Sequence, residues 1–391
     1  MLKILKNPFY IYPVSFGIVF SLYALDWSDA FPKITATTTI FFICTFFISI
    51  VFGDSVDKLK YIGYSKIQGG KPSKEFMAIA FILLGVFIEI LYEGGSPLIS
   101  AIKGERGVYY KDFGIKFFHV VLVSYNSFLT VYMFHMFLST KKKKHLIYYL
   151  ITYVPPLLIF NRGMIILGLV SSFFVFISSQ KRTLNFKQIF FLLVSGITAL
   201  YSFGVLGNIR LANGDERYIL NVSGASKTFD ESKIPKEFFW TYLYGASPLA
   251  NFQENINKTE TVDYNFFELA VSEMTPDYLS KRIKPIFQLD EEIKSHRVRD
   301  FLTVGTVFMN SYSIAKWFGP IILYIYSIFL LFLLFGVVPK KSKYHVSSIA
   351  ILSTLILMNT FSNMFVFSGI ILQLVYPIVF AYFENKKLVI K

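Results

Sequence analysis

Long apolar runs, each roughly 16 to 22 residues in length, limit the fold of this 391-residue chain more than any other feature. An α-helix needs about 20 predominantly apolar residues to cross the hydrocarbon core of a bilayer. Hydrophobic residues make up 54% of the chain and charged residues only 16%, which is too apolar for a soluble protein of this length. We therefore predict an all-α polytopic membrane protein, with residues 1–391 forming a single integral membrane domain in a lipid bilayer.

The charge pattern predicts how the chain is oriented. We predict about ten transmembrane helices, at residues 8–25, 34–53, 76–93, 117–138, 146–161, 163–179, 188–208, 318–337, 345–361 and 363–382. With the N-terminus inside, the inner segments are 1–7, 54–75, 139–145, 180–187, 338–344 and 383–391. They hold 20 of the 39 basic and four of the 25 acidic residues, a net charge of +16, while the rest of the chain carries −2. Short cytoplasmic loops are enriched in Lys and Arg, so both termini are predicted to be cytoplasmic.

One arginine lies in the middle of an apolar run, in the stretch "LIFNRGMIILG" at 158–168. A charge at the bilayer centre costs roughly 2.5 to 3.5 kcal/mol on insertion scales. The basic loops on both sides are predicted inside, so residues 146–179 must cross twice and turn at Asn161-Arg162-Gly163. Arg162 then lies outside at a helix N-terminus, where free N–H groups and a guanidinium favour an anion. The alternative is an arginine that contacts lipid headgroups.

The long polar segment 209–317 is predicted to be a large outer loop that contains short helices. Loops of this length without secondary structure are uncommon in compact proteins, so we expect surface helices over a cavity. Ser247, followed by Pro248, is a candidate helix N-cap. A second outer loop, 94–116, is rich in glycine.

The sequence lacks the motifs that several classes of enzyme require. The sequence has no phosphate-binding P-loop, no HExxH, no CxxC and no Asp-x-Asp motif, so neither a cofactor nor a metal is predicted. Asp26 and Asp29 in "DWSD" could bind a metal or act as a base, but more often such a pair polarises a short loop. Cys44 is the single cysteine, which excludes an internal disulfide. The net charge of +14 follows the membrane topology and does not predict nucleic acid as a partner.

Basic side chains gather on the predicted outer face. They are Arg106, Arg162, Arg210, Arg217, Arg282, Arg297 and Arg299. Arginines over a membrane cavity could neutralise a lipid-linked diphosphate and stabilise it as a leaving group. His296 and His119 are possible acid–base groups, although a single histidine is more often structural.

Four stretches resemble a known family. They are "GGSPLISAI…YKDFGIKFFH" (94–119), "NRGMIIL" (161–167), "FGVLGNIR" (203–210) and "IPKEFFWTYLYGASPLANF" (234–252). Together they resemble the oligosaccharide repeat unit polymerases of O-antigen and capsule synthesis, the bacterial Wzy-like family. The resemblance implies a multi-pass glycosyltransferase of the bacterial inner membrane that needs neither nucleotide nor metal. Such an enzyme moves a growing glycan from undecaprenyl diphosphate onto the next lipid-linked repeat unit, on the outer side.

The resemblance also implies roles for particular residues. Arg162 and Arg210 match outer-face arginines of the family and would hold the diphosphate. Tyr244, Ser247 and Asn251 match its "Y-x-x-SPL-x-N" stretch and would shape the glycan cavity. The Arg-x-Gly motifs of some members are not matched cleanly, so substrate binding by Arg106, Arg217, Arg297 and Arg299 follows from predicted position alone. The acceptor base is open between His296 and a loop carboxylate such as Asp300, with His296 as the catalytic candidate.

Other functions use similar parts. A ligase would transfer the same lipid-linked glycan to a different acceptor molecule, and a transporter or flippase would move it across the membrane. Transporters commonly contain repeated halves and charges near the bilayer midplane. The sequence has no visible repeat, and its charges avoid the span centres. A polymerase could also work with a chain-length regulator and a flippase as partners.

The diphosphate role of the two matched arginines can be tested in cells. Arg162→Ala or Arg210→Ala should leave a folded, inserted protein that makes only single-repeat glycans, because the leaving group would no longer be neutralised. Gel separation of lipid-linked glycans by length measures this. Full-length polymer in both variants would remove the diphosphate role from these two residues.

Overall fold

The protein is built from helices. The computed structural model describes residues 2–67, 72–103, 113–180, 185–212, 215–260 and 262–389, and every regular element in these ranges is a helix. The elements are α1 (Leu2–Lys6), α2 (Pro8–Tyr23), α3 (Ala36–Lys58), α4 (Pro72–Glu93), α5 (Pro97–Ile102), α6 (Phe118–Thr140), α7 (Lys143–Ile151), α8 (Val154–Leu158), α9 (Arg162–Ser179), α10 (Phe186–Ala212), α11 (Glu216–Val222), α12 (Lys227–Asp230), α13 (Phe238–Lys258), α14 (Phe266–Leu269), the π-helix η1 (Ala270–Met274), α15 (Asp277–Ile286), α16 (Met309–Ala315), α17 (Phe318–Val337), α18 (His345–Met358), α19 (Ser368–Ile371), the 3-10 helix η2 (Leu372–Leu374) and α20 (Val375–Val389).

Six of the described helices, α3, α4, α6, α9, α10 and α17, are long and apolar enough to cross a membrane. Shorter apolar helices occupy Pro8–Tyr23, His345–Met358 and Ser368–Glu384. The prediction of an all-α chain is confirmed for the described residues, and several of its helices have the length and composition that a membrane span requires. The predicted segment 146–161 is divided between α7 and α8, so the number of ten spans stays a prediction.

Polar side chains cap the N-termini of α2 and α3, where the sequence changes from a loop to an apolar run. The side chain of Asn7 accepts a hydrogen bond from the N–H of Phe9 at the start of α2, and Thr35 accepts from Thr38 at the start of α3. Pro8 occupies the first turn of α2, where its missing N–H has no cost. These caps satisfy backbone donors that have no partner within the helix.

The turn predicted around Arg162 is present. Helix α8 ends at Leu158 and α9 begins at Arg162, with Asn161 as the N-cap whose side chain accepts from the N–H of Met164. Phe160 makes the turn in the left-handed region, with φ of 57°. The first arm of this hairpin is interrupted between Ile151 and Val154, just before the Pro155–Pro156 pair.

The segments predicted to be inner meet at one end of the helices, which we call the basic end. Lys3 pairs with Asp57 at 3.0 Å, and the Lys6 ammonium donates to the Gln180 carbonyl at 2.6 Å. Further bonds link these segments to one another: Tyr64 to Ser139, Lys340 to the Lys60 carbonyl, and Ser342 to Glu384. All six predicted inner segments therefore contribute a residue to this connected set.

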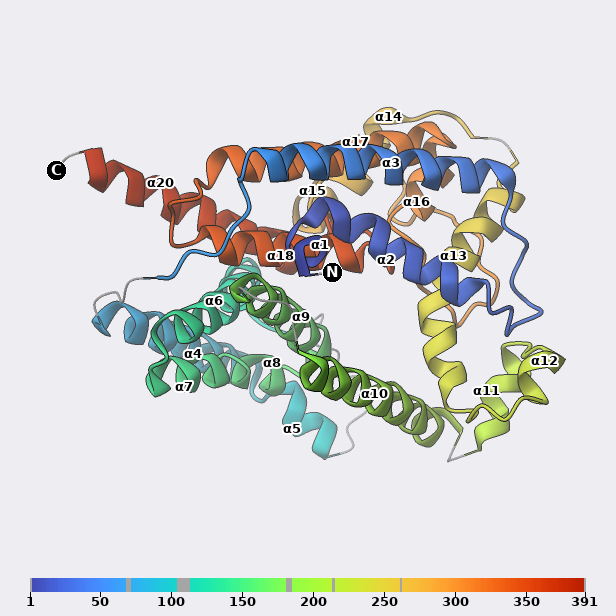
Figure 1. Ribbon diagram of the computed structural model, residues 1–391, viewed down its shortest axis with the longest axis horizontal. Coiled ribbons are helices and arrows are strands. Elements are labelled where there is room, and N and C mark those ends of the chain that lie inside the picture. The colour runs from blue at the N-terminus through green and yellow to red at the C-terminus, as the bar shows by residue number, and fades with distance from the viewer. Residues whose placement is uncertain are drawn as a thin grey trace.

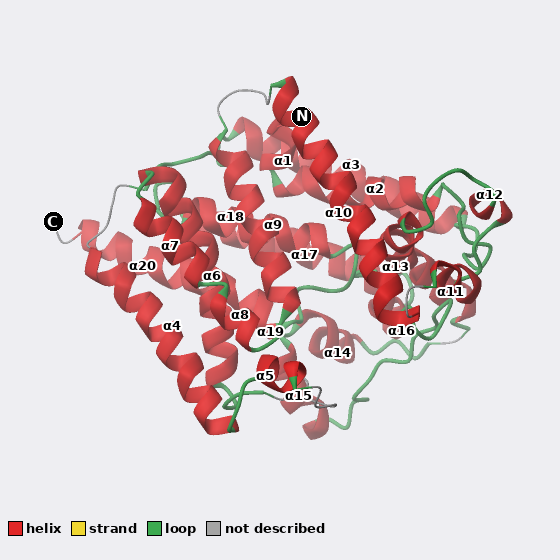
Figure 2. Cartoon of the chain, turned by 90° about the horizontal axis from the view of Figure 1, so that it is seen from below, coloured by secondary structure: helices red, strands yellow, loops and turns green. Residues whose placement is uncertain are grey.

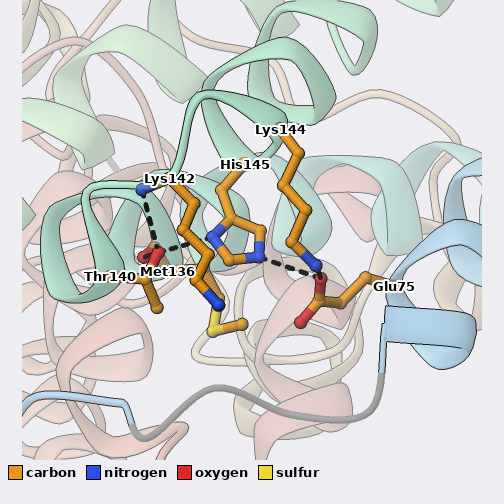
Figure 3. Close-up of polar contacts among 6 residues, drawn as sticks. All are labelled: Glu75, Met136, Thr140, Lys142, Lys144 and His145. Atoms are coloured by element: carbon orange, nitrogen blue, oxygen red, sulfur yellow. Dashed lines mark hydrogen bonds and ion pairs between the residues drawn. The ribbon is translucent and has the colours of Figure 1, made fainter.

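A buried carboxylate ties α4 to α7 at the basic end (Figure 3). Glu75 accepts from the ammonium of Lys144 at 3.0 Å and lies 2.9 Å from His145 Nε2. The other ring nitrogen of His145 lies 2.6 Å from the Thr140 hydroxyl. A buried charge that lost its partner would be strongly destabilising, so this cluster fixes the ends of three helices.

The other end, which we call the loop end, carries the segments 24–35, 94–103, 113–117, 215–316 and 359–367. Figure 2 places α5, α11, α12, α14, α15 and α16 along the side of the molecule away from both termini. Helix α13 runs across the ends of α2 and α10 there, with its axis steeply inclined to theirs (Figure 1). Helix α10 is exposed along nearly its whole length and packs against α13 through Gly204 and Gly207.

The close approach of α10 and α13 gives a paired test of stability. A Cβ at Gly204 would lie 2.1 Å from the Glu237 carbonyl oxygen, whereas a Cβ at Gly196, on the same helix, would meet nothing within 4 Å. Gly204→Ala should destabilise the protein by about 1 to 3 kcal/mol because backbone atoms must move apart. Gly196→Ala should leave stability equal or slightly higher, because alanine favours the helix. Thermal unfolding in detergent measures both, and equal melting temperatures would contradict the α10–α13 packing.

Candidate functional site

A polar cavity of about 100 Å³ lies at the loop end, where three stretches of chain that are far apart in the sequence meet. One is η1, the second is the segment 295–310, which is irregular up to the start of α16, and the third is the turn after α18. The lining residues are Glu273, Ser295, Arg297, Thr303, Gly305, Thr306, Val307, Met309, Asn310, Ser362 and Asn363. The cavity is therefore lined by one carboxylate, one guanidinium, two side-chain amides and several hydroxyls.

Glu273 is the buried acid of this cavity, with only 3% of its surface exposed. Its Oε1 accepts from the Asn310 amide at 3.2 Å, and its Oε2 accepts from the Asn363 amide at 2.9 Å. Burial raises the pKa of Glu273 from 4.5 to about 7, while the two amide hydrogen bonds and the charge of Lys284 oppose that shift. Near neutral pH, the carboxyl group can both take up and release a proton.

The backbone around Glu273 is held in place from both sides. Residues 270–274 form a π-helix, and the Thr275 hydroxyl donates to the Ala270 carbonyl at 2.9 Å where this turn ends. Asn363 also donates to the Glu273 carbonyl oxygen at 2.8 Å. The N–H of Asp277 donates to the Val366 carbonyl at 2.6 Å. Single π turns of this kind are rare and are frequent at functional sites.

Two asparagines on successive turns of α13 position the segment that carries Arg297. Asn251 donates to the carbonyl oxygens of Leu302 and Val304 at 2.6 and 2.7 Å and accepts from the N–H of Val298 at 2.9 Å. Asn255 accepts from the N–H of His296 at 2.9 Å. The backbone on both sides of Arg297 is therefore bonded to α13.

Arg297 joins the small cavity to a larger one. Ser295 and Arg297 line both the Glu273 cavity and a neighbouring cavity of about 400 Å³. The larger cavity is also lined by His296 and Asp300, and both of these side chains are exposed to solvent. Among the residues predicted from the sequence, His296 and Arg297 are thus brought together, with Asp300 beside them.

The "Y-x-x-SPL-x-N" stretch is accounted for by packing. Ser247 is 1% exposed and lies inside α13, which continues through Pro248, so the prediction of a helix N-cap at Ser247 was wrong. Packing of α13 across α2 and α10 outweighs the local preference for a helix start. The Tyr244 ring packs edge-on against Phe203 of α10, with ring centroids 5.0 Å apart. The Asn251 side chain forms hydrogen bonds with the backbone of the segment 298–304.

Three of the other predicted arginines, Arg162, Arg217 and Arg299, are not among the lining residues of the Glu273 cavity. Arg162 is exposed at the start of α9, with its guanidinium carbon 5.8 Å from the centre of the Phe160 ring. Arg217 is paired with Asp230 at 3.4 Å on the surface, and Arg299 lies beside Gly224. Arg210 belongs to α10, but its side chain lies outside the described part of the chain, as does the whole of Arg106.

A second titratable pair lies between α4 and α6 at the loop end. Glu89, which is fully buried, accepts from the N–H of Ile115 at 3.2 Å, and its other oxygen lies 2.9 Å from His119 Nδ1. A Cβ at Gly114 would lie 2.5 Å from His119 Nδ1, and Gly114 has a φ of 100° that suits glycine. The "FGIKFFH" stretch (113–119) thus packs over a carboxylate–histidine pair that joins two helices.

Glu273, Asn310 and Asn363 were not predicted from the sequence. A usable signal was present, because Glu273 stands in "LAVSEM" (269–274), where one acid interrupts an otherwise small and apolar stretch. Its partners could not be found in this way, since Asn363 is 90 residues distant and nothing periodic connects the two.

The described helices define a class, an all-helical protein with several helices that can cross a membrane. No protein-family model, no curated protein and no solved structure matches the chain. The function is therefore argued from the cavity and from the distribution of charge.

The raised pKa of Glu273 makes the stability of the protein depend on pH. Folding keeps this carboxyl protonated up to about pH 7, whereas the unfolded chain releases the proton near 4.5. Its contribution to stability is thus fully present below pH 4.5 and is lost as pH rises through 7. Glu273→Gln removes this loss, so its stability relative to the wild type should rise from pH 5 to pH 8 by on the order of 2 to 3 kcal/mol.

Thermal unfolding of purified protein in detergent at pH 5 and pH 8 measures this difference. Glu231→Gln is the matched control, because it removes an exposed carboxylate of the same loop. It should change little between the two pH values. A Glu273→Gln difference that is the same at both pH values would contradict the raised pKa.

Proposed function

We propose that this protein is a membrane glycosyltransferase that polymerises undecaprenyl-diphosphate-linked oligosaccharide repeat units into O-antigen or capsular polysaccharide. The observation that carries the proposal is the polar cavity at the loop end, which combines Glu273 and Arg297 over the ends of apolar helices. The reaction takes place on the outer face of a bacterial inner membrane. The resemblance of four sequence stretches to the Wzy-like polymerases supports the same reaction.

The charge distribution supports the orientation. The basic end gathers residues from all six segments that the sequence predicts to be cytoplasmic. If Lys and Arg mark the cytoplasmic side, the loop end with its cavity faces outward, both termini are cytoplasmic and the chain crosses ten times. Residues 209–317 then form an outer loop over the membrane, as expected for an enzyme whose two substrates are both lipid-linked.

The chemistry of the cavity fits transfer from a lipid diphosphate. Breaking the bond between the anomeric carbon and the phosphate oxygen places negative charge on the leaving diphosphate. A guanidinium can neutralise that charge through forked hydrogen bonds. Arg297 lines both the small and the larger cavity. It would therefore lie next to a diphosphate bound in one cavity and next to a sugar bound in the other. Arg162 and Arg210 are further diphosphate ligands in this proposal, on the strength of the resemblance.

The role of Arg297 is tested by complementation of a deletion strain with variants. Arg297→Ala should reduce the rate of chain elongation by about 10²- to 10³-fold, the usual effect of removing one electrostatic donor, and leave mainly single-repeat glycans. Arg297→Lys should retain part of the activity because the charge remains. Lys281→Ala, which removes an exposed cation of α15, is the matched control and should make wild-type polymer.

The product analysis separates the proposal from its alternatives. Longer glycans on the same lipid support a polymerase. Transfer of the glycan to a different molecule would identify a ligase, and movement across the membrane without a new bond would identify a transporter. Wild-type polymer from Arg297→Ala would remove the diphosphate role from this residue.

A further inference from the structure

A transfer between two lipid-linked glycans needs a group that takes the proton of the acceptor hydroxyl, and the cavity offers one. Resting on the function proposed above, we propose that Glu273 is the general base that deprotonates the acceptor sugar, held in position by Asn310 and Asn363. The sequence pointed to His296 or to a loop carboxylate such as Asp300 for this task. Both of those side chains lie on exposed chain, whereas Glu273 is enclosed.

The two amides fix the carboxylate without using up its capacity to accept. Each oxygen of Glu273 receives one amide hydrogen bond, at 3.2 Å from Asn310 and 2.9 Å from Asn363. An ionised carboxylate offers about four lone-pair sites, so one further site on each oxygen can accept a hydroxyl proton. Since the side chain lines the cavity, a sugar hydroxyl there meets an oriented acceptor.

The surroundings of Glu273 suit a group that must change its protonation state. The charged side chains around it are the Lys284 ammonium, which favours the carboxylate, and the Arg297 guanidinium on the cavity wall. The other polar lining groups, from Ser295, Thr303, Thr306 and Ser362, are neutral hydroxyls. Burial holds the pKa of Glu273 at about 7, close to the value at which a general base works best at neutral pH.

The step balances in atoms and electrons. The O–H bond of the acceptor hydroxyl breaks, and its proton goes to a free lone pair of the Glu273 carboxylate. The hydroxyl oxygen uses its electron pair to bond the anomeric carbon of the donor glycan. The bond from that carbon to the phosphate oxygen breaks, and its electron pair stays on the departing diphosphate. The proton on Glu273 then passes to water or to the released diphosphate, which regenerates the base.

The test uses the full-length protein in detergent with lipid-linked single repeat units extracted from source cells that lack this gene. Elongation is measured from pH 5.5 to pH 9. Wild-type activity should rise with pH along a limb centred near 7, because the base must be ionised. Glu273→Gln should lower the elongation rate by about 10²- to 10⁴-fold and abolish that limb.

Two further variants keep the result interpretable. Glu268→Gln removes a half-buried carboxylate of the preceding helix α14 and should elongate like the wild type. Glu273→Asp keeps the charge but shortens the side chain, so it should retain reduced activity with the limb displaced in pH. If Glu273→Gln fails to fold, the Glu273→Asp profile decides the question.

The outcomes separate this inference from the proposed function. A wild-type protein that elongates nothing overturns the polymerase proposal and the base together. A wild type that elongates, with Glu273→Gln equally active at every pH, overturns the base assignment and leaves the polymerase proposal standing. A Glu273→Asp limb that coincides with the wild-type limb also overturns the assignment, because another group would then set the pH dependence.

Discussion

Buried asparagine side chains hold the irregular backbone at the loop end, and the cavity depends on them. Asn251 and Asn255 bond the segment 296–304 to α13. Asn359 accepts from the N–H of Met364, and Asn363 bonds η1. A buried backbone group without a partner costs roughly 1 to 3 kcal/mol, and more where apolar surroundings exclude water. A side-chain amide can donate and accept hydrogen bonds at the same time. Asn251 on α13 therefore satisfies two backbone carbonyls and one backbone N–H.

This arrangement lets a carboxylate be buried beside chain that is not helical. Glu273 receives only neutral donors directly, and the nearby cations are Lys284 and Arg297. A direct ion pair would have favoured the charged form and held the pKa low. The amide contacts fix the geometry while burial keeps proton binding near neutral pH, which is the combination that acid–base chemistry at a sugar hydroxyl requires.

Charge is segregated between the two ends of the helices. The described part of the basic end uses lysines together with a few carboxylates, as in the Glu75 cluster, and connects chain from the first to the last helix. The loop end also uses amides, hydroxyls and aromatic rings, and its cations include both lysines and arginines. If the bilayer lies between these ends, the substrate-facing chemistry and the topology-determining charges occupy opposite sides of the membrane and do not compete.

The sequence by itself determined the helical class, the turn at Arg162 and the grouping of the basic segments, because apolar run length, local caps and loop charge are properties of neighbouring residues. It also indicated Arg297 and His296 as cavity residues. Only the tertiary structure decided that Glu273 meets Asn363, 90 residues away, that α13 continues through Pro248, and that Asn251 holds backbone. These contacts depend on how distant segments pack, and polar residues in irregular chain carry no period that would reveal their partners.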